Sequence, residues 1–566
     1  MKTMTIAFSL ALGLSTFNTS AQQPGYPPPP PPSREGPTGN PGAPGQHTSL
    51  LREFRPIGGS GNNLEHPEFD PVPGSAELAI APLNFAPGTG DGLVAGPNPR
   101  TISNIIAGGT SSTGQNAETN DPVASAWLYV FGQFLDHDLS LESSPQTSPL
   151  IDVVVLPNDP TFKAGTSIVM TRVTRSPFTN TIINTTAGYL DLSQLYGSTA
   201  KTAASLRNPD GTLQSSDNGQ ALPVVDNAFV TGDPRVMENP ELTATTTLFM
   251  REHNYWVGTL KASNPSWTGD QLYNMAKAIT TAEYQNIVYK EYLPLLIGPA
   301  LEPYIGYNPR VNAQVTQEFA TAAFRVGHSQ VSDTQEGLDN NGNVVFTEPL
   351  AQAFFNTPEI DETNGINPLL RSISADFSQA TDVYTVAALR NLLFAPLPGG
   401  DVDEIDLIAI DIQRERDIGL ATLNQTRKAL GFAPYHSFDE LTLDPVLQQN
   451  LETVYGSINN VDLFMGGLAE SHAPGAIVGP TFQAIIARQF AALRDGDRFF
   501  WLNEGFDPQT ASMISNTTLG DIIRRNTDST NVPAHVFVAA PPLNHIKVHI
   551  KDPSIDSQTH GQSLNQ

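Results

Sequence analysis

The chain has 566 residues, and its 57 Asp and Glu outnumber its 30 Lys and Arg to give a formal net charge of −27. Such an anionic surface disfavours nucleic acid and anionic membranes as partners. The chain contains no cysteine, which excludes iron–sulfur clusters, cysteine nucleophiles and disulfides. Its length is ample for one large domain with a buried cofactor site.

Residues 1–21 have the pattern of a signal peptide. Lys2 gives a short positive start, Ile6 to Leu14 form an apolar run, and residues 19–21 (TSA) form a small-residue cleavage site. The apolar run is too short to span a bilayer, and no later stretch is apolar for long enough. We therefore expect a secreted protein, extracellular or periplasmic, without a membrane span.

Residues 22–50 form a Pro/Gly-rich segment of low complexity, with an unbroken proline run from Pro27 to Pro32. Consecutive prolines make an extended, semi-rigid spacer, and this composition cannot build a core. We expect a disordered linker at 22–50, one folded domain at 51–552 and a disordered tail at 553–566. The linker is interpreted as a tether, with a disordered leader of no further role as the alternative.

The stretch from Asp121 to Glu142 predicts a helix that forms part of a site. Asp121 suits the N-cap position. Large apolar residues recur at helical spacing and form one stripe: Trp127, Phe131, Phe134 and Leu135. On another face Gln133 and His137 are stacked four residues apart, with Asp136 beside them. Burying these polar groups is costly unless something pairs with them, so this face is predicted to line a site.

Residues 185–198 (TTAGYLDLSQLYGS) place side-chain and backbone oxygens around Asp191 and Ser193. These are the hard ligands that calcium prefers. The alternative is that Asp191 only caps the following turn.

Other helices carry clear start signals. Asn239 and Pro240 suit the cap and first residue of one helix. Residues 268–271 resemble a capping box that opens a helix running to about Ile297. A further helix is predicted at 318–331 (EFATAAFRVGHSQV), packed through Phe319, Ala322, Ala323 and Val326. Between residues 153 and 183 we expect a strand-rich or irregular insert.

Five motifs follow one another in a familiar order: GQFLDHD (132–138), TTAGYLDLSQLYGS (185–198), GDPRVMENP (232–240), FRVGHS (324–329) and AIDIQRERD (409–417). In this order they resemble the animal haem peroxidase family of the peroxidase–cyclooxygenase superfamily. The absence of cysteine from a secreted chain favours a bacterial-type member. The resemblance implies a mainly α fold, with helices packed around a central haem and little β structure.

The resemblance also implies roles for individual residues. The catalytic set would be His137 as the base above haem b, Gln133 beside it, and Arg235. The cofactor-binding set would be larger: His328 as axial ligand of the haem iron, Asp136 and Glu238 as carboxylates able to form haem esters, Asp411 as acceptor for His328, Arg414 as partner of a propionate, and Arg325. Calcium would be bound by Asp138, the Tyr189 carbonyl, Asp191 and Ser193.

Three positions depart from the family's pattern. Ala187 stands where a threonine is usual, so one hydroxyl ligand of calcium is missing unless Thr186 supplies it. Asn239 stands where some members have a methionine bonded to haem through sulfur, so we predict no such bond. Asp411 stands where the best-studied mammalian members have asparagine. A carboxylate there gives His328 more anionic character, so we expect a lower reduction potential than in chloride-oxidising members.

The function implied is a haem-dependent peroxidase that reduces hydrogen peroxide and oxidises small organic donors and halides. A fatty-acid dioxygenase of the same superfamily is one alternative. It would need a radical tyrosine close to the haem and a long apolar channel, and no YHWHP-like segment lies near His328. A non-catalytic adhesive or matrix protein on a peroxidase scaffold is another alternative. Retention of Gln133, His137, Arg235 and His328 together argues against it.

Overall fold

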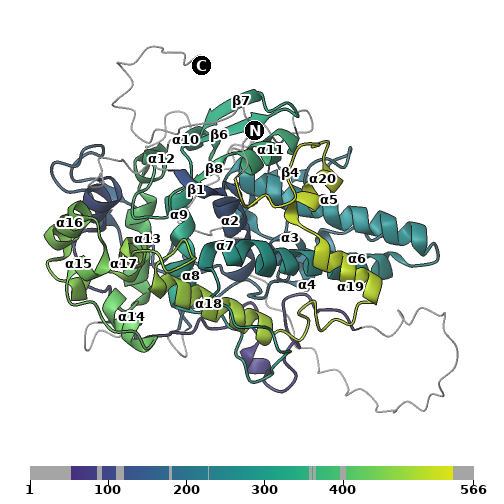
Figure 1. The fold of residues 1–566 in the computed structure, drawn as a ribbon, viewed down its shortest axis with the longest axis horizontal. Helices are drawn as coiled ribbons and strands as arrows, with labels where there is room; N and C mark the ends of the chain where they lie inside the picture. Colours follow the sequence, from purple (N-terminus) through teal and green to yellow (C-terminus); the bar gives the residue numbers. More distant parts are fainter. Residues whose placement is uncertain are drawn as a thin grey trace.

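A computed structural model describes residues 53–85, 92–109, 120–176, 181–226, 228–355, 360, 365–394 and 403–539. The predicted signal peptide, linker and tail lie outside the described residues. Within the described part, helices dominate and the few strands are short, with β6 (Thr334–Leu338) and β7 (Val344–Pro349) at the upper edge of the view (Figure 1). The prediction of a mainly α fold with little β structure is confirmed.

The helices vary from single turns to the 24 residues of α5. Their bounds are α1 (Pro99–Ile102), α2 (Trp127–Leu139), α3 (Ser193–Tyr196), α4 (Ala200–Ser205), α5 (Pro240–Ser263), α6 (Gly269–Ile287), α7 (Leu293–Ile297), α8 (Gln317–Thr321), α9 (Gly327–Gln330), α10 (Leu350–Ala353), α11 (Asn367–Ala375), α12 (Ala387–Arg390), α13 (Leu407–Ile418), α14 (Leu423–Ala429), α15 (Phe438–Leu441), α16 (Pro445–Tyr455), α17 (Leu463–Ala469), α18 (Pro480–Asp495), α19 (Pro508–Asn516) and α20 (Leu519–Asn526).

Among the described residues, the strands form two-stranded antiparallel sheets. The pairs are β1 (Asn120–Ser125) with β8 (Phe377–Gln379), β2 (Val153–Val154) with β3 (Ser167–Ile168), β4 (Val224–Val225) with β5 (Ala228–Phe229), β6 (Thr334–Leu338) with β7 (Val344–Pro349), and β9 (Leu392–Phe394) with β10 (Asp403–Ile405). The insert predicted between residues 153 and 183 contains only β2, β3 and isolated bridges, as expected.

Helix α2 starts later and ends earlier than predicted. Residues 120–125 form β1 instead of a first helical turn, and the Ser125 N–H donates to the Phe537 carbonyl at 2.9 Å. The Asp121 carboxylate accepts from the N–H groups of Val123 and Ala124, both at 2.7 Å. Aspartate caps turns as readily as helices, so Asp121 begins a turn here and not the helix. At the other end, Ser140 is extended.

The starts of α5 and α6 are confirmed. The Asn239 side chain accepts from the Leu242 N–H, and Pro240 is the first residue of α5. Thr268 and Gln271 form a reciprocal capping box at the start of α6. Past α6 the chain continues through a π-helical segment, η5 (Val288–Tyr292), into α7, which ends at Ile297. The predicted end of this helical run is therefore also confirmed.

The prediction of one continuous helix at 318–331 is wrong, because this stretch forms three separate pieces. These are α8, a 3₁₀ segment η6 (Ala323–Val326), and α9. The break falls at Ala322, whose φ of −127° and ψ of −68° are not helical. The Arg325 guanidinium donates through Nε to the Ala320 carbonyl at 3.1 Å, taking an acceptor that a continuous helix would use.

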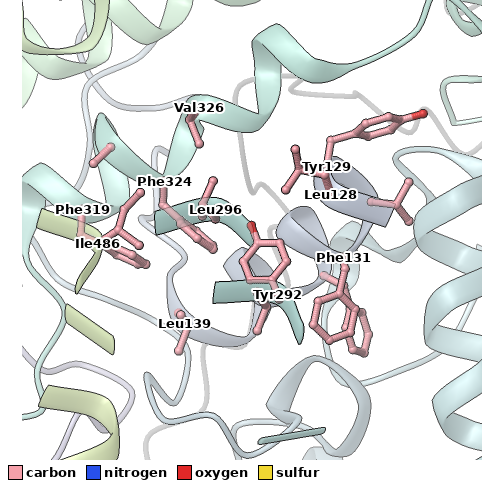
Figure 2. Close-up of a cluster of buried hydrophobic side chains, with 14 of the residues drawn as sticks. Leu128, Tyr129, Phe131, Leu139, Tyr292, Leu296, Phe319, Phe324, Val326 and Ile486 are labelled. Carbon is pink, nitrogen blue, oxygen red and sulfur yellow. The ribbon is translucent and has the colours of Figure 1, made fainter. Parts of the chain in front are cut away.

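Helix α2 lies in the middle of the core. Trp127, Phe131 and Phe134 are fully buried, and Trp127 Nε1 donates to Ser374 Oγ of α11 at 2.8 Å. Phe134 stacks on Phe249 of α5 with a centroid distance of 5.0 Å. Figure 2 shows Tyr292 between Phe131 and other buried rings. Each fully buried ring contributes roughly 1.5–3 kcal/mol, so this packing fixes α2 firmly in the core.

Candidate active site

A cavity is lined by α2, the start of α5, η6, α9 and the segment from α10 to α13. Polar and titratable side chains on its wall are Gln133, Asp136, His137, Glu238, Asn239, Glu241, Arg325 and His328. Apolar side chains there include Val331, Leu350, Phe354, Leu389, Leu392, Ile405 and Leu407.

Gln133 and His137 of α2 both face this cavity, as the four-residue spacing predicts. Gln133 Nε2 donates to Glu238 Oε2 at 3.0 Å, and its Oε1 accepts from Asn239 Nδ2 at 2.8 Å. These two bonds fix the orientation of the amide. The preceding residue, Gly132, leaves no room for a side chain, because a Cβ there would lie 2.8 Å from the Tyr292 hydroxyl.

His137 is held as a neutral imidazole. Burial, helped by the positive charge of Arg235, lowers its pKa from 6.5 to about 3. Its Nε2 lies 3.5 Å from Glu238 Oε2. A neutral imidazole facing a cavity is able to accept a proton, which is the property a general base needs.

Asp136 and Glu238 are the cavity carboxyls that the sequence proposed for ester bonds, and both line the wall. Burial raises the pKa of Asp136 to about 6 and that of Glu238 to about 7. The nearby Arg235 lowers both pKa values and so partly offsets burial. Each group is therefore a buried acid that could lose its proton near neutral pH.

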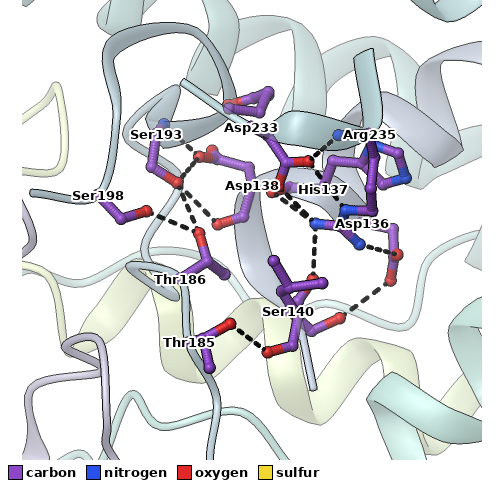
Figure 3. Close-up of polar contacts among 12 residues, drawn as sticks. Asp136, His137, Asp138, Ser140, Thr185, Thr186, Ser193, Ser198, Asp233 and Arg235 are labelled. Carbon is purple, nitrogen blue, oxygen red and sulfur yellow. Dashed lines mark hydrogen bonds and ion pairs between the residues drawn. The ribbon is translucent and has the colours of Figure 1, made fainter. Parts of the chain in front are cut away.

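Arg235 is not one of the cavity-lining residues, and Figure 3 shows it next to Asp233, His137 and Asp136. It sits in the 3₁₀ segment η4 (Pro234–Met237), and its Nε and Nη2 donate to Asp233 at 2.9 and 2.8 Å. Its Nη2 also donates to the carbonyls of His137 and Ser140 at 3.3 and 3.0 Å, while Nη1 is 3.9 Å from Asp136 Oδ2. Arg235 thus fixes the end of α2 and acts on the wall by its charge.

His328 of α9 faces the same cavity from another element. Its Nδ1 is 2.6 Å from Asp411 Oδ2 on α13, as the sequence predicted for this pair. The other carboxylate oxygen accepts from Arg325 Nη1 at 2.8 Å. With Nδ1 bonded to the carboxylate, Nε2 is the nitrogen left to bind a metal in the cavity.

Arg414 is placed differently from its predicted role. It is 2% exposed, and its Nη1 donates to Asp417 Oδ2 at 2.8 Å and to the Thr171 carbonyl at 3.0 Å. Its Nη2 is 3.3 Å from Ser144 Oγ. Arg325, by contrast, lies on the cavity wall and is the guanidinium better placed for a cofactor carboxylate.

Asp138 points away from the cavity, towards the loop before α3 (Figure 3). Its carboxylate accepts from the N–H groups of Asp191 and Leu192 at 3.1 and 3.0 Å, and from Ser193 Oγ at 2.9 Å. Ser193 Oγ also lies 3.2 Å from Thr186 Oγ1 and 3.4 Å from the Ala187 carbonyl. The loop therefore gathers several oxygens around one point, and Thr186 supplies a hydroxyl there.

The Asp191 carboxylate carries the second observation on this loop. Its Oδ1 is buried and has no hydrogen-bond partner. Burial raises the pKa of both Asp138 and Asp191, and their proximity adds to that of Asp138. Among the described residues no group of three acidic or histidine side chains forms a metal site. Two carboxylates with hydroxyl and carbonyl oxygens nevertheless fit calcium. A bound ion would neutralise the charge of the two carboxylates.

Sequence reasoning missed Glu241 and Tyr129 as cavity residues. The Tyr129 hydroxyl donates to Glu241 Oε1 at 3.2 Å, and burial raises the pKa of Glu241 to about 8. Glu241 lies three residues after Glu238, a spacing that could have indicated it. The buried His253 lies outside the cavity wall and has both ring nitrogens engaged, with the Tyr196 hydroxyl and the Gly211 carbonyl, each at 3.0 Å.

The family model described as animal haem peroxidase matches residues 54–537. The chain belongs to the animal haem peroxidase family. Membership implies haem as cofactor and confirms the recognition made from the motifs. Peroxinectin A of Dictyostelium discoideum is 30% identical over 516 residues, which cover 85% of this chain and 94% of that protein.

Solved structures agree on the fold of this animal haem peroxidase. Peroxidase A from Dictyostelium discoideum superposes with a TM-score of 0.75 at 28% identity, covering 86% of this chain and 99% of that one. A fatty acid alpha-dioxygenase of Arabidopsis thaliana gives a TM-score of 0.73 at 20% identity, covering 89% and 88%. The second likeness shows only a shared fold. In the described part of the chain, no helix is both long and apolar enough to cross a membrane.

Proposed function

We propose that this protein is a haem peroxidase that reduces hydrogen peroxide and oxidises small organic donors and halides. The observation that carries the proposal is one cavity lined by two histidines in different states. His137 is neutral and faces the cavity, while His328 has its Nδ1 bonded to Asp411 and its Nε2 left for a metal. This pairing of a free base with an anchored ligand is what peroxide cleavage on haem requires.

The proposed haem b would be held by residues of the cavity wall. His328 Nε2 would bind the haem iron, and Arg325 would pair with a propionate, because a guanidinium pairs well with a carboxylate. Arg414, which donates to Asp417, would support the cavity wall from behind and not contact the haem. Asp136 and Glu238 lie on the wall and would be the carboxylates that form ester bonds. A bound haem supplies the one- and two-electron redox chemistry.

His137 would move the proton in the reaction. Its Nε2 accepts a proton from one oxygen of hydrogen peroxide and returns it to the other, which leaves as water. Gln133, held by Glu238 and Asn239, would orient the peroxide through its amide. Arg235 would act as a positioning residue, since it holds the end of α2 and keeps His137 neutral by its charge.

Calcium is proposed as a structural ion next to the site. Its ligands would be Asp138, Asp191, Ser193, Thr186 and the Tyr189 carbonyl. The unpartnered Oδ1 of Asp191 and the oxygens around Ser193 Oγ support this assignment. Since Asp138 follows His137 directly, an ion there would hold α2 in place. We also propose that residues 1–21 are a signal peptide and that the enzyme is secreted.

Fatty-acid dioxygenase chemistry is the second candidate. Tyr129 and Tyr292 line the cavity together with an apolar wall, and these features favour it. The two candidates differ in their oxidant. We would supply the haem-loaded protein with hydrogen peroxide and a phenol, or with molecular oxygen and a long-chain fatty acid. Turnover of the phenol alone supports the peroxidase, and oxygen uptake with the fatty acid alone would replace it. Haem loading without either activity would favour the adhesive or matrix scaffold.

A further inference from the structure

A chain of aromatic rings leads away from the cavity wall. Tyr292 of η5 and Phe324 of η6 both line the cavity, and their ring centroids are 6.4 Å apart. Phe324 in turn contacts Phe490 of α18 at 5.5 Å. These contacts are edge-to-face or tilted, which is the favoured packing of aromatic pairs. Figure 2 shows Tyr292 and Phe324 side by side at the start of this chain.

The same chain continues to the surface. Phe490 contacts Tyr289 at 6.3 Å, Tyr289 contacts Phe500 at 5.4 Å, and Phe500 contacts Tyr304 at 5.0 Å. Tyr304 is half-buried and precedes Ile305, which is 95% exposed. Rings from five separate segments thus form an unbroken series of contacts from the cavity to a surface loop.

The surroundings of each phenol decide where an oxidised tyrosine is stable. A tyrosine loses an electron readily only when its phenol proton can also leave. The Tyr289 hydroxyl donates a hydrogen bond to the Phe490 carbonyl at 2.7 Å in part-buried surroundings, and a carbonyl is no base. The Tyr304 hydroxyl donates to Asn503 Oδ1 at 2.9 Å. This amide oxygen is no base either, but the bond is exposed, so water can accept the proton. An oxidising equivalent would therefore pass Tyr289 and come to rest at Tyr304.

We propose that Tyr304 is a second oxidation site, which serves phenolic donors too bulky to enter the cavity. The proposal rests on the proposed peroxidase function, because hydrogen peroxide is the oxidant. Tyr304 gives one electron to the oxidised cofactor through the ring chain and its proton to water. A bulky phenol then gives one electron and one proton to restore Tyr304. Two such donors per peroxide return the cofactor to its resting state, and two waters are formed.

Close packing alone would also place rings in contact, so the test must separate the two readings. Tyr304→Phe keeps the ring and its packing but removes the phenol. Tyr307→Phe is a matched control, because Tyr307 lies on the same loop and no ring contact joins it to the chain in the described residues. Phe500→Leu interrupts the chain before Tyr304 while keeping an apolar side chain.

The experiment uses the haem-loaded full chain and two donors with the same phenol. N-acetyltyramine is small enough for the cavity, and tyramine coupled through its amine to dextran is not. We expect Tyr304→Phe and Phe500→Leu to lose at least tenfold in the rate with the dextran-linked phenol. The rate with N-acetyltyramine should stay within twofold of wild type, and Tyr307→Phe should behave as wild type with both donors.

A second readout is the tyrosyl radical seen by electron paramagnetic resonance after peroxide is added without donor. We expect its signal in wild type and Tyr307→Phe and its loss in Tyr304→Phe. If Tyr304→Phe keeps both the radical and the rate with the dextran-linked phenol, this inference is overturned and the peroxidase proposal stands. If wild type oxidises neither donor, both proposals are overturned.

Discussion

Asp411 Oδ2 lies 2.6 Å from Nδ1 of His328, and Asp411 Oδ1 accepts from Arg325 at 2.8 Å. The carboxylate therefore serves two partners at once. One oxygen bonds the imidazole and the other accepts from the guanidinium. Since a carboxylate acceptor raises the basicity of a ligating histidine, this pair sets the electron density that His328 gives to a metal.

Asp411→Asn tests this relationship. The amide still accepts from His328 but carries no charge, so the imidazole becomes a weaker donor and the ferric state is less favoured. We expect the ferric/ferrous potential of the haem-loaded protein to rise by about 60 mV or more, which is tenfold in a one-electron equilibrium. Asp439→Asn, an exposed position, is the control for loss of one charge. An unchanged potential would rule out a role for Asp411 in tuning the metal.

His328→Ala should abolish stable haem binding, because the axial ligand is removed and only the cavity wall is left. Added imidazole should restore binding by entering the space vacated by the side chain. The measurement is the haem-to-protein ratio after gel filtration, with and without imidazole. Full retention of haem by the variant without imidazole would show that another residue ligates the iron.

Removal of calcium should destabilise the fold around α2. A chelator should lower the melting temperature of wild type, since a ligand that binds only the folded state stabilises it. Asp191→Asn removes one charged ligand and should leave a protein that is already less stable and responds little to the chelator. Equal chelator sensitivity in Asp191→Asn and wild type would place the ion elsewhere. No response to the chelator in wild type would contradict the proposal of a structural calcium ion.

Glu241 should make the haem-free protein less stable as pH rises. Burial raises its pKa from 4.5 to about 8, so the folded state keeps a proton that the unfolded chain releases in this interval. Stability from this group is full below about pH 4.5 and falls between 4.5 and 8. The loss should be about 5 kcal/mol. Glu241→Gln should flatten this part of a melting-temperature profile, and an equally steep profile in the variant would exclude Glu241 as its source.

The sequence predicted the parts of the site that follow from local periodicity. Gln133 and His137 face one cavity because four residues make about one helical turn, and this holds wherever the helix begins. Asp138 faces the loop at 185–198 because one further residue along the helix is rotated by roughly 100°. The error at Asp121 did not affect the site, since the misassigned boundary lies six residues before the first residue of α2.

Partner choice could not be predicted, because it depends on groups that meet only in the folded chain. Arg235 is engaged by Asp233 and by the end of α2, which places it behind the wall. Arg325 donates to the Ala320 carbonyl and breaks a stretch whose apolar residues favour a continuous helix. Arg414 is the exception, since its partner Asp417 is three residues away on α13 and was readable as a helical pair.

The central claim is that His137 is the base that starts peroxide cleavage in this cavity. The most direct test is the absorption spectrum of the haem-loaded mature chain before and after one equivalent of hydrogen peroxide, beside His137→Ala. We predict a rapid change of the Soret band in wild type and a rate lower by roughly 10²–10⁴-fold in the variant. A Soret band that does not change when peroxide is added to wild type, or that changes equally fast in His137→Ala, would contradict the claim.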